Sequence, residues 1–319
     1  MAIIDSKLSS LVDRKPNVQS TLDFLWLEVT NACNLTCSHC YAGSGPNGGV
    51  DDKLSQEQYI SVINAAADIG CRKVQFIGGE ATLHPGLPKM IEVARSRKFT
   101  SIEVFTNLVR LNEQLLDCFV QNGVSVASSF YSFNAATHDS ITGRPGSWQR
   151  TVVNLKSILA AGLDCRVGII TMDQNRADLQ KTEAFLHSLG VLDIGRDEVR
   201  AFGRAASDDG SPEMSELCGS CAGDVICVGY DGKVSPCIMS KHWSVGDLAE
   251  SSFADILSSR KLGVTREQIH AETWHSDQDK ARMGSCNPDC TPCSPKTDQN
   301  CTPKTYCYPK HSPGCSPKF

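Results

Sequence analysis

Short apolar runs alternate with amphipathic stretches along the first two thirds of the chain. A continuous apolar run predicts a buried strand, whereas apolar residues that recur every three or four positions predict a helix. On this basis we expect strands at residues 24–29, 73–77, 101–106, 125–130, 166–171 and 198–202. Helices are expected from residue 55 to 70 and over residues 87–97, 112–121, 148–161 and 178–189.

The helix after the first strand has the clearest boundaries. Ser55 is a predicted N-cap with Gln58 at the capping-box position, and Gly70 ends the apolar pattern. Regular strand–helix alternation indicates a parallel sheet, and six units favour an open, partial (β/α)6 barrel of the TIM type over a closed eight-stranded one. A doubly wound sheet gives the same alternation, so the pattern alone leaves both α/β architectures open.

Beyond the sixth strand the composition changes. Residues 206–213 are polar and form a predicted linker. Asp231-Gly232 between two apolar runs predicts a β-hairpin, and a helical segment is expected to begin at Gly246 and end near Leu262. The predicted domains are an N-terminal arm at residues 1–22, the barrel at 23–206 and a small cysteine-rich domain at 207–319.

Composition excludes several classes of protein. The 319 residues carry a net charge of −5, whereas a nucleic-acid partner normally requires a basic face. The apolar runs are too short to span a bilayer, which argues against a membrane partner. The first residues lack the basic start, apolar centre and cleavage site of a signal peptide. We therefore expect a cytoplasmic protein whose thiols stay reduced.

Sixteen cysteines in a reducing compartment indicate metal chemistry. A disulfide-rich secreted tail is the alternative, but it conflicts with the missing signal peptide. Three cysteines lie close together after the first strand, and ten lie between Cys218 and Cys315. The remaining three stand apart on or near predicted helices and strands, where a free cysteine usually acts as a small buried hydrophobe: Cys71, Cys118 and Cys165.

The first group has the spacing C-x3-C-x2-C, with Cys33, Cys37 and Cys40 on one short loop. Three thiolates can hold three irons of a cubane [4Fe–4S] cluster, which normally takes four cysteine ligands. The fourth iron is then open to a small molecule, just as catalytic metal sites keep an open position. A zinc site with a distant fourth ligand is the alternative interpretation of this spacing.

This spacing, followed by Gly78-Gly79-Glu80 after the second strand, resembles the radical S-adenosylmethionine (SAM) enzymes. The resemblance implies that SAM binds the open iron. One electron from the cluster then cleaves SAM to methionine and a 5′-deoxyadenosyl radical, which abstracts hydrogen from a substrate. It also implies a partial barrel rather than a doubly wound sheet. His39 occupies the family's position beside the adenine, and the G-G-E motif would bind the SAM amino group.

The same resemblance adds candidates on later strands, since barrel sites gather at the carboxyl ends of strands. Polar side chains on strands three to five would bind SAM, chiefly its ribose and carboxylate: Thr106, Asn107, Ser128, Ser129 and Arg166. A solvent-facing role is the alternative for Arg166. Gly203-Arg204-Ala205 resembles the segment that leads from the barrel to its C-terminal extension. The stretch from His138 to Arg144 resembles a loop that either faces the substrate or is structural.

The second group of cysteines resembles the SPASM extension of radical SAM peptide maturases, which carries two auxiliary [4Fe–4S] clusters. Carried over by order, the ligands would be Cys221, Cys227, Cys237 and Cys307 for the first cluster, and Cys290, Cys293, Cys301 and Cys315 for the second. Cys218 and Cys286 are spare, and either could replace a neighbour. The proline-rich tail has little apolar content, so metal–thiolate bonds would have to fold it. Three clusters are expected in all.

The leading hypothesis is an enzyme that modifies a ribosomally made peptide in natural-product biosynthesis, with flavodoxin or ferredoxin as electron donor. An open barrel would admit a chain-like substrate, although the stretch before the first strand is too short for a leader-peptide-binding domain. The second hypothesis is a radical SAM dehydrogenase, decarboxylase or epimerase that acts on a small sugar or nucleoside. The third is a non-catalytic iron–sulfur or zinc scaffold, which would not cleave SAM.

Overall fold

The computed structural model describes residues 22–206 and 212–273. In the first part strands and helices alternate: β1 (Phe24–Glu28), α1 (Gln56–Asp68), β2 (Lys73–Ile77), α2 (Leu87–Ser96), β3 (Ser101–Phe105), α3 (Glu113–Asn122), β4 (Ser125–Phe130), α4 (Ala135–Thr142), α5 (Ser147–Ala160), β5 (Cys165–Thr171), α6 (Leu179–Ser188) and β6 (Asp193–Glu198). The second part adds β7 (Val225–Val228), β8 (Lys233–Ser235), β9 (Gly246–Asp247), α7 (Phe253–Leu257) and α8 (Arg260–Thr273). Three short 3-10 helices also carry residues discussed below: η5 (Gly203–Ala205), η7 (Ser220–Ala222) and η8 (Lys241–Trp243).

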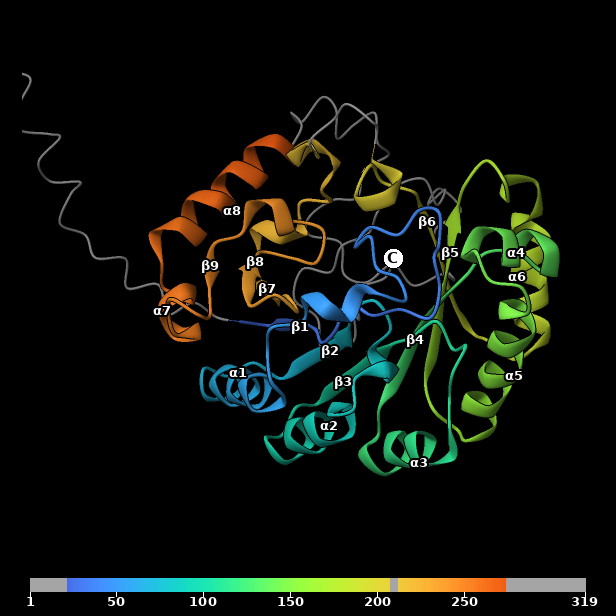
Figure 1. Cartoon of the computed structure of the whole chain (residues 1–319), viewed down its shortest axis with the longest axis horizontal. Helices are drawn as coiled ribbons and strands as arrows, with labels where there is room; N and C mark the ends of the chain where they lie inside the picture. The colour runs from blue at the N-terminus through green and yellow to red at the C-terminus, as the bar shows by residue number, and fades with distance from the viewer. Residues whose placement is uncertain (1–21, 207–211, 274–319) are drawn as a thin grey trace, which may run out of the picture.

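All described strands belong to one sheet, in the order β6-β5-β4-β3-β2-β1-β7-β8-β9 (Figure 1). From β1 to β6 each strand pairs in parallel with the next one along the chain. A doubly wound sheet would reverse its strand order at a switch point. The sheet is therefore of the open-barrel kind, and the predicted six-unit partial barrel is confirmed.

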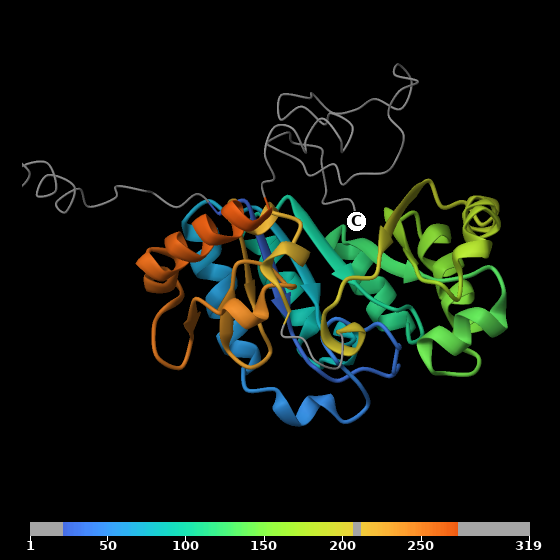
Figure 2. The same ribbon diagram turned by 90° about the horizontal axis from the view of Figure 1, so that it is seen from above.

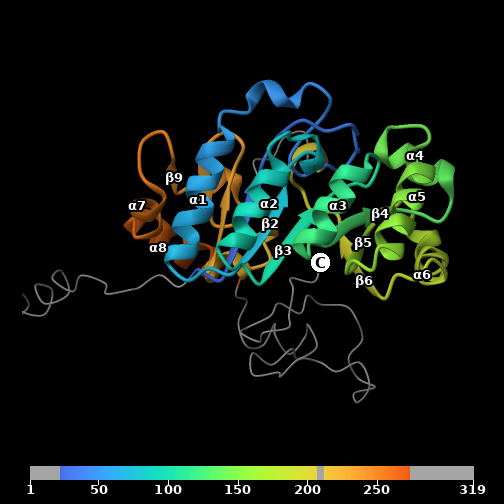
Figure 3. The same cartoon turned by 90° about the horizontal axis from the view of Figure 1, so that it is seen from below.

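Helices cover the outer face of this sheet, with α1, α2 and α3 side by side (Figure 3). Leu25 and Leu27 of β1 and Phe76 of β2 are fully buried in the core beneath them. The predicted capping box begins α1, because Ser55 Oγ accepts from the Gln58 N–H and the Gln58 side chain accepts from the Ser55 N–H. The outer layer thus forms where the apolar pattern predicts it.

The opposite face of the sheet carries a buried polar layer. Gln75 and Glu103 are in register on β2 and β3, and the Gln75 amide donates to the Glu103 carboxylate. Arg166 donates two hydrogen bonds of 2.6 and 2.7 Å to the same carboxylate. Arg166 lies near the amino end of β5, whereas the three-cysteine loop leaves the carboxyl end of β1. Arg166 is buried in this layer, so the solvent-facing alternative is wrong, whereas its contact with SAM stays a prediction.

The end of the barrel differs from the sequence prediction. The sixth strand is Asp193–Glu198 rather than residues 198–202. It is a polar, partly exposed strand paired only with β5 among the described strands, so no apolar run marks it. Phe202, the last residue of the predicted strand, is buried in a second, smaller core. The stretch expected as a loop before Gly143 forms the helix α4.

The second part of the chain continues the sheet of the first, because β7 pairs in parallel with β1 and antiparallel with β8. The hairpin predicted at Asp231-Gly232 is confirmed. The helical start predicted at Gly246 is wrong, since Gly246 and Asp247 form β9 beside β8. The helices α7 and α8 follow, at the opposite end of the molecule from α4–α6 (Figure 2). Within the described ranges, no helix combines the length and apolar character of a membrane span.

The Arg166–Glu103 pair tests the polar layer. Arg166→Met leaves a buried carboxylate without its cation, so we expect the free energy of unfolding to fall by about 3–5 kcal/mol in urea. Adding Glu103→Gln removes the charge and should restore part of this loss. Lys89→Met breaks the exposed pair with Glu92 and should cost less than about 1 kcal/mol. Equal losses of unfolding free energy for Arg166→Met and Lys89→Met would contradict a stabilising role of the buried Arg166–Glu103 pair.

Candidate metal centre

Residues 30–45, here called the cysteine loop, follow β1 and carry Cys33, Cys37 and Cys40. All three are free thiols; Cys33 is buried and the other two are half-buried. The pKa of Cys33 and of Cys37 is raised to about 12, chiefly by burial and to a smaller extent by the neighbouring cysteines. Metal coordination deprotonates a thiol outright, so loading this loop would release protons.

The first support of the cysteine loop is the end of β2. The Gly79 N–H donates to the Thr30 carbonyl at 2.7 Å, and the Glu80 N–H donates to the Ala32 carbonyl at 2.8 Å. A Cβ at Gly79 would overlap the Ala32 carbonyl oxygen. Glycine is therefore required here for close packing of one loop on the other. The G-G-E motif lies directly against the start of the cysteine loop, as the sequence predicts for a shared site.

The second support comes from the end of α4. The N–H groups of Thr36 and Ser38 donate to the carbonyls of Thr142 and Ile141, each at 3.0 Å. Arg144 donates a 2.8 Å hydrogen bond to the carbonyl of Asn34. These contacts show that the stretch from His138 to Arg144 has a structural role at the cysteine loop.

The third support is Arg204 of η5, which binds three carbonyl groups of the cysteine loop. Its backbone N–H donates to Cys40 at 3.0 Å, Nε donates to Cys37 at 2.7 Å, and Nη1 donates to Ser44 at 2.8 Å. Gly203 precedes it at φ +56°, where a Cβ would overlap the carbonyl oxygens of Cys40 and Tyr41. The sequence singled out this segment by resemblance, but its role in holding the cysteines becomes visible only in the structure.

Glu80 occupies a buried pocket between the ends of β2 and β3. Its Oε1 accepts from the Thr82 N–H (3.1 Å), the Thr82 hydroxyl (2.6 Å) and the Thr106 hydroxyl (2.6 Å). Its Oε2 accepts from the Asn107 N–H at 2.7 Å. Burial raises the pKa of Glu80, and these four hydrogen bonds oppose the rise. The carboxylate thus joins two strand ends beside the cysteine loop.

His39 lies inside the same region. Its ring contacts that of Tyr131 edge-on, with centroids 5.0 Å apart, and its Nδ1 is buried with no hydrogen-bond partner in the described part of the chain. Burial, with a smaller effect of Arg204, lowers the pKa of His39 to about 4. The imidazole is therefore neutral at pH 7, which suits a position beside an uncharged aromatic base.

The four short polar residues predicted at strand ends divide into two pairs. Thr106 and Asn107 are occupied by protein groups: the Thr106 hydroxyl is bound to Glu80, and the Asn107 side chain is hydrogen-bonded at both its oxygen and its nitrogen. The contacts of Thr106 and Asn107 with SAM stay predictions. Ser128 is buried and Ser129 half-buried on β4, and their contacts with SAM stay predictions.

The three free thiols of the cysteine loop are the donor type that holds three irons of a cubane cluster. Across residues 22–206 and 212–273, no three His, Cys, Asp or Glu side chains converge as the ligands of one metal ion would. Ligands of a cubane bind different irons and therefore stand farther apart. The Cys33 sulfur also accepts hydrogen bonds from the Leu35 N–H (3.4 Å) and the Asn107 amide (3.7 Å), as iron-bound thiolates do.

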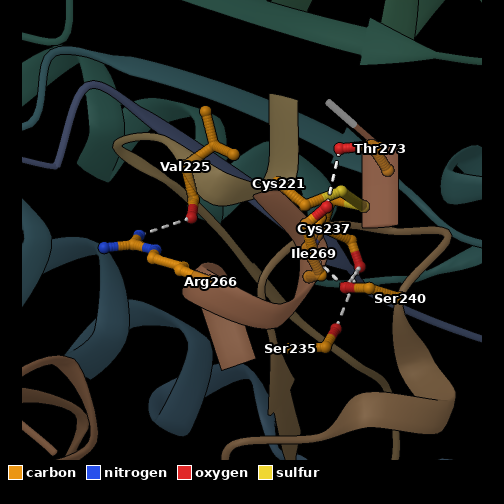
Figure 4. The surroundings of a disulfide bond; sticks show 8 residues. All are labelled: Cys221, Val225, Ser235, Cys237, Ser240, Arg266, Ile269 and Thr273. Carbon is orange, nitrogen blue, oxygen red and sulfur yellow. Dashed lines mark hydrogen bonds between the residues drawn. A yellow bond between two sulfur atoms is a disulfide. The ribbon is translucent and has the colours of Figure 1, made fainter. Parts of the chain in front are cut away.

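The described cysteines of the second group are not gathered as the ligands of one metal ion. Cys221 and Cys237 form a disulfide, with Cα atoms 5.4 Å apart, and pack with Ile269 of α8 (Figure 4). The sequence predicts that both cysteines bind iron, which requires that the disulfide be reduced. The spacing of the two cysteines brings their sulfurs together but does not distinguish a disulfide from a pair of iron ligands. Cys227 is free and buried on β7, and Cys218 is free and half-buried. The predicted ligands Cys290, Cys293, Cys301, Cys307 and Cys315, and the spare Cys286, lie outside the described residues.

Sequence reasoning missed a buried charged cluster at the junction of the two parts. Glu28 of β1 is fully buried, with Oε1 2.7 Å from Lys241 Nζ and 3.2 Å from the Tyr41 hydroxyl, which donates to it. The Lys241 ammonium also lies over the rings of Tyr41 and Tyr230, at 5.6 and 5.0 Å from their centroids. An acidic residue at the end of an apolar run was the signal available in the sequence.

Comparison with known proteins places these features in a family. A model of the radical SAM superfamily matches residues 27–186, half of the chain, and a model of an iron–sulfur cluster-binding domain, SPASM, matches residues 218–293. The sporulation killing factor maturation protein SkfB of Bacillus subtilis is 28% identical over 291 residues, which cover 79% of this chain and 70% of SkfB. The subtilosin biosynthesis protein AlbA of the same organism is 28% identical over 179 residues, 56% of this chain and 39% of AlbA.

Among solved structures, Streptococcus suis SuiB bound to its precursor peptide SuiA has the same fold. The TM-score is 0.65 at 12% sequence identity, over 77% of this chain and 66% of SuiB. Fold and cysteine loop together define an open α/β barrel with three cysteines on the loop that follows its first strand. The chain belongs to the radical SAM superfamily. Its cofactors are accordingly a [4Fe–4S] cluster, SAM and auxiliary iron–sulfur clusters in the second domain.

Arg204 provides a test of how the cysteine loop is held. Arg204→Met removes two side-chain hydrogen bonds to loop carbonyls, and one such charged bond is worth about 1.5 kcal/mol or more. We therefore expect iron to be lost roughly tenfold faster from the reconstituted protein under a chelator. Arg95→Met is the matched control, since Arg95 binds the carbonyls of Asn122 and Phe99 in the outer layer.

The control variant should lose stability but keep its iron. Iron release from Arg204→Met at the rate of the wild type would contradict a role of Arg204 in holding the cysteine loop.

Proposed function

We propose that this protein is a radical SAM enzyme that modifies a ribosomally made precursor peptide. The observation that carries the proposal is the extent of the likeness to SkfB, a protein named for the maturation of a killing factor, which spans 79% of this chain. AlbA, named for bacteriocin biosynthesis, and SuiB, solved with a precursor peptide, support the same substrate class. The described strands form an open sheet rather than a closed barrel, which leaves room for a chain-like substrate.

The residues that would serve the SAM reaction surround the cysteine loop. Cys33, Cys37 and Cys40 would hold the cluster, which when bound supplies the electron that cleaves SAM to the hydrogen-abstracting 5′-deoxyadenosyl radical. His39, neutral and flat, would lie beside the adenine. Backbone groups of Gly78 and Gly79, with Glu80, would bind the amino group of SAM. The predicted pocket would be completed by residues of the next three strands and the ends of those strands: Thr106, Asn107, Ser128, Ser129 and Arg166.

The second domain would hold two auxiliary clusters with the ligand sets predicted from the sequence. The first needs the Cys221–Cys237 pair in its reduced form, together with Cys227 and Cys307. A cytoplasmic location, where glutathione and thioredoxin keep thiols reduced, fits this requirement. Flavodoxin or ferredoxin would be the electron donor.

The test uses the reconstituted, reduced enzyme with SAM and a short peptide encoded beside its gene. We expect the peptide to bind, to accelerate 5′-deoxyadenosine formation and to change mass through loss of hydrogen. A scrambled peptide of the same composition is the control, and a mixture of sugars and nucleosides is offered in parallel. Turnover in which only a sugar or nucleoside is altered would overturn the proposal in favour of a small-molecule enzyme.

A further inference from the structure

Cys33 is the least exposed of the three cysteines, and among the described residues its sulfur receives a side-chain N–H. Its Sγ accepts a backbone hydrogen bond from Leu35 at 3.4 Å and a hydrogen bond from Asn107 Nδ2 at 3.7 Å. Leu35 belongs to the cysteine loop itself, whereas Asn107 follows β3. The side-chain donor therefore comes from the barrel and can be removed without changing the loop sequence.

The orientation of the Asn107 amide is fixed by two further hydrogen bonds. Its Oδ1 accepts from the Val109 N–H at 2.9 Å, and its Nδ2 donates to Asn34 Oδ1 at 2.7 Å. Because the oxygen is held by an N–H donor, a flipped amide would face donor against donor. One hydrogen of Nδ2 goes to Asn34, and the second is directed at the sulfur of Cys33.

The backbone of Asn107 is held just as firmly. Its N–H donates to the carboxylate of Glu80 at 2.7 Å, and its carbonyl accepts from the Thr151 hydroxyl at 3.0 Å. Glu80 and Thr151 are both buried. Protein groups thus hold the amide against the sulfur, which is the arrangement that outer-shell groups of metal sites show.

We propose that Asn107 is a positioning residue of the SAM cluster, which donates a hydrogen bond to the Cys33 thiolate and makes the cluster easier to reduce. Reduction adds negative charge to the iron–thiolate unit, and an N–H donor stabilises the more negative state more strongly. Hydrogen bonds to the sulfurs are among the factors that set the potentials of iron–sulfur clusters. The inference rests on the cluster assigned to the cysteine loop and not on the peptide substrate.

A redox titration followed by electron paramagnetic resonance tests this in the full-length, reconstituted protein. The signal of the SAM cluster is identified as the one absent when Cys33, Cys37 and Cys40 are replaced by Ala. Asn107→Leu removes the donor at similar volume, and we expect the reduced-to-oxidised ratio at a fixed potential to fall about tenfold. For a one-electron couple this is a shift of the midpoint by about 59 mV to more negative values.

Two further variants separate the hydrogen bond from general damage. Asn107→Asp keeps the Oδ1 acceptor for Val109 but places a carboxylate beside the thiolate, so its midpoint should be more negative than that of Asn107→Leu. Asn122→Leu is the matched control: it removes a hydrogen bond of the same kind, from Asn122 Nδ2 to Cys118 Sγ at 3.7 Å on the outer helix α3, so it should keep the midpoint of the wild type. A purely structural role of Asn107 would not produce this order of potentials.

The proposal is overturned if Asn107→Leu keeps its iron and the potential of the wild type. If Asn107→Leu loses the cluster, the Asn107→Asp variant is used instead. A midpoint of Asn107→Asp that is no more negative than that of the wild type then overturns the proposal. A wild type without the SAM-cluster signal would instead contradict the proposed function. Failure of a peptide to react leaves the order of potentials unaffected, so the two failures are distinguishable.

Discussion

A buried irregular loop must find partners for the backbone N–H and C=O groups that it does not pair within itself, and here that loop carries the three cysteines. The end of β2, the end of α4 and η5 each bind a different part of it. These supports lie far apart in the chain, between residues 79 and 204, and only the winding of the barrel brings them together. The folded barrel is therefore what keeps three thiols at one site despite the cost of burying them.

The same strand that leads into the cysteine loop also joins the two parts of the protein. β1 lies between β2 and β7, so the radical SAM barrel and the cysteine-rich domain share one sheet. Glu28 adds a buried ion pair with Lys241 of η8 and a hydrogen bond from Tyr41, the residue after Cys40. Loss of one partner of a buried ion pair strongly destabilises a protein, because the other charge stays buried without a counter-charge. Substitutions in η8 should therefore also disturb the cysteine loop.

The sequence predicts most of the fold because β1 to β5 are short apolar runs and α1 begins with a capping box. It misplaces β6, whose residues are polar because the strand lies partly exposed at the sheet edge. In the site, the triplet and G-G-E motif could be predicted from spacing and resemblance. The partners of Asn107, Arg166 and Glu28 could not, since each is contacted by residues distant in sequence. The Cys221–Cys237 disulfide could not be predicted either, because the spacing of these cysteines suits a disulfide as well as a shared cluster.

The central claim is that the cysteine loop binds the cluster that cleaves SAM. It is tested most directly by 5′-deoxyadenosine formation in the reduced protein when Cys33, Cys37 and Cys40 are all replaced by Ala. The account predicts no product from the variant, although about eight of about twelve irons remain, since the two auxiliary cubanes are untouched. Undiminished SAM cleavage by the variant would contradict the account, because no other described residues offer the open iron that SAM requires.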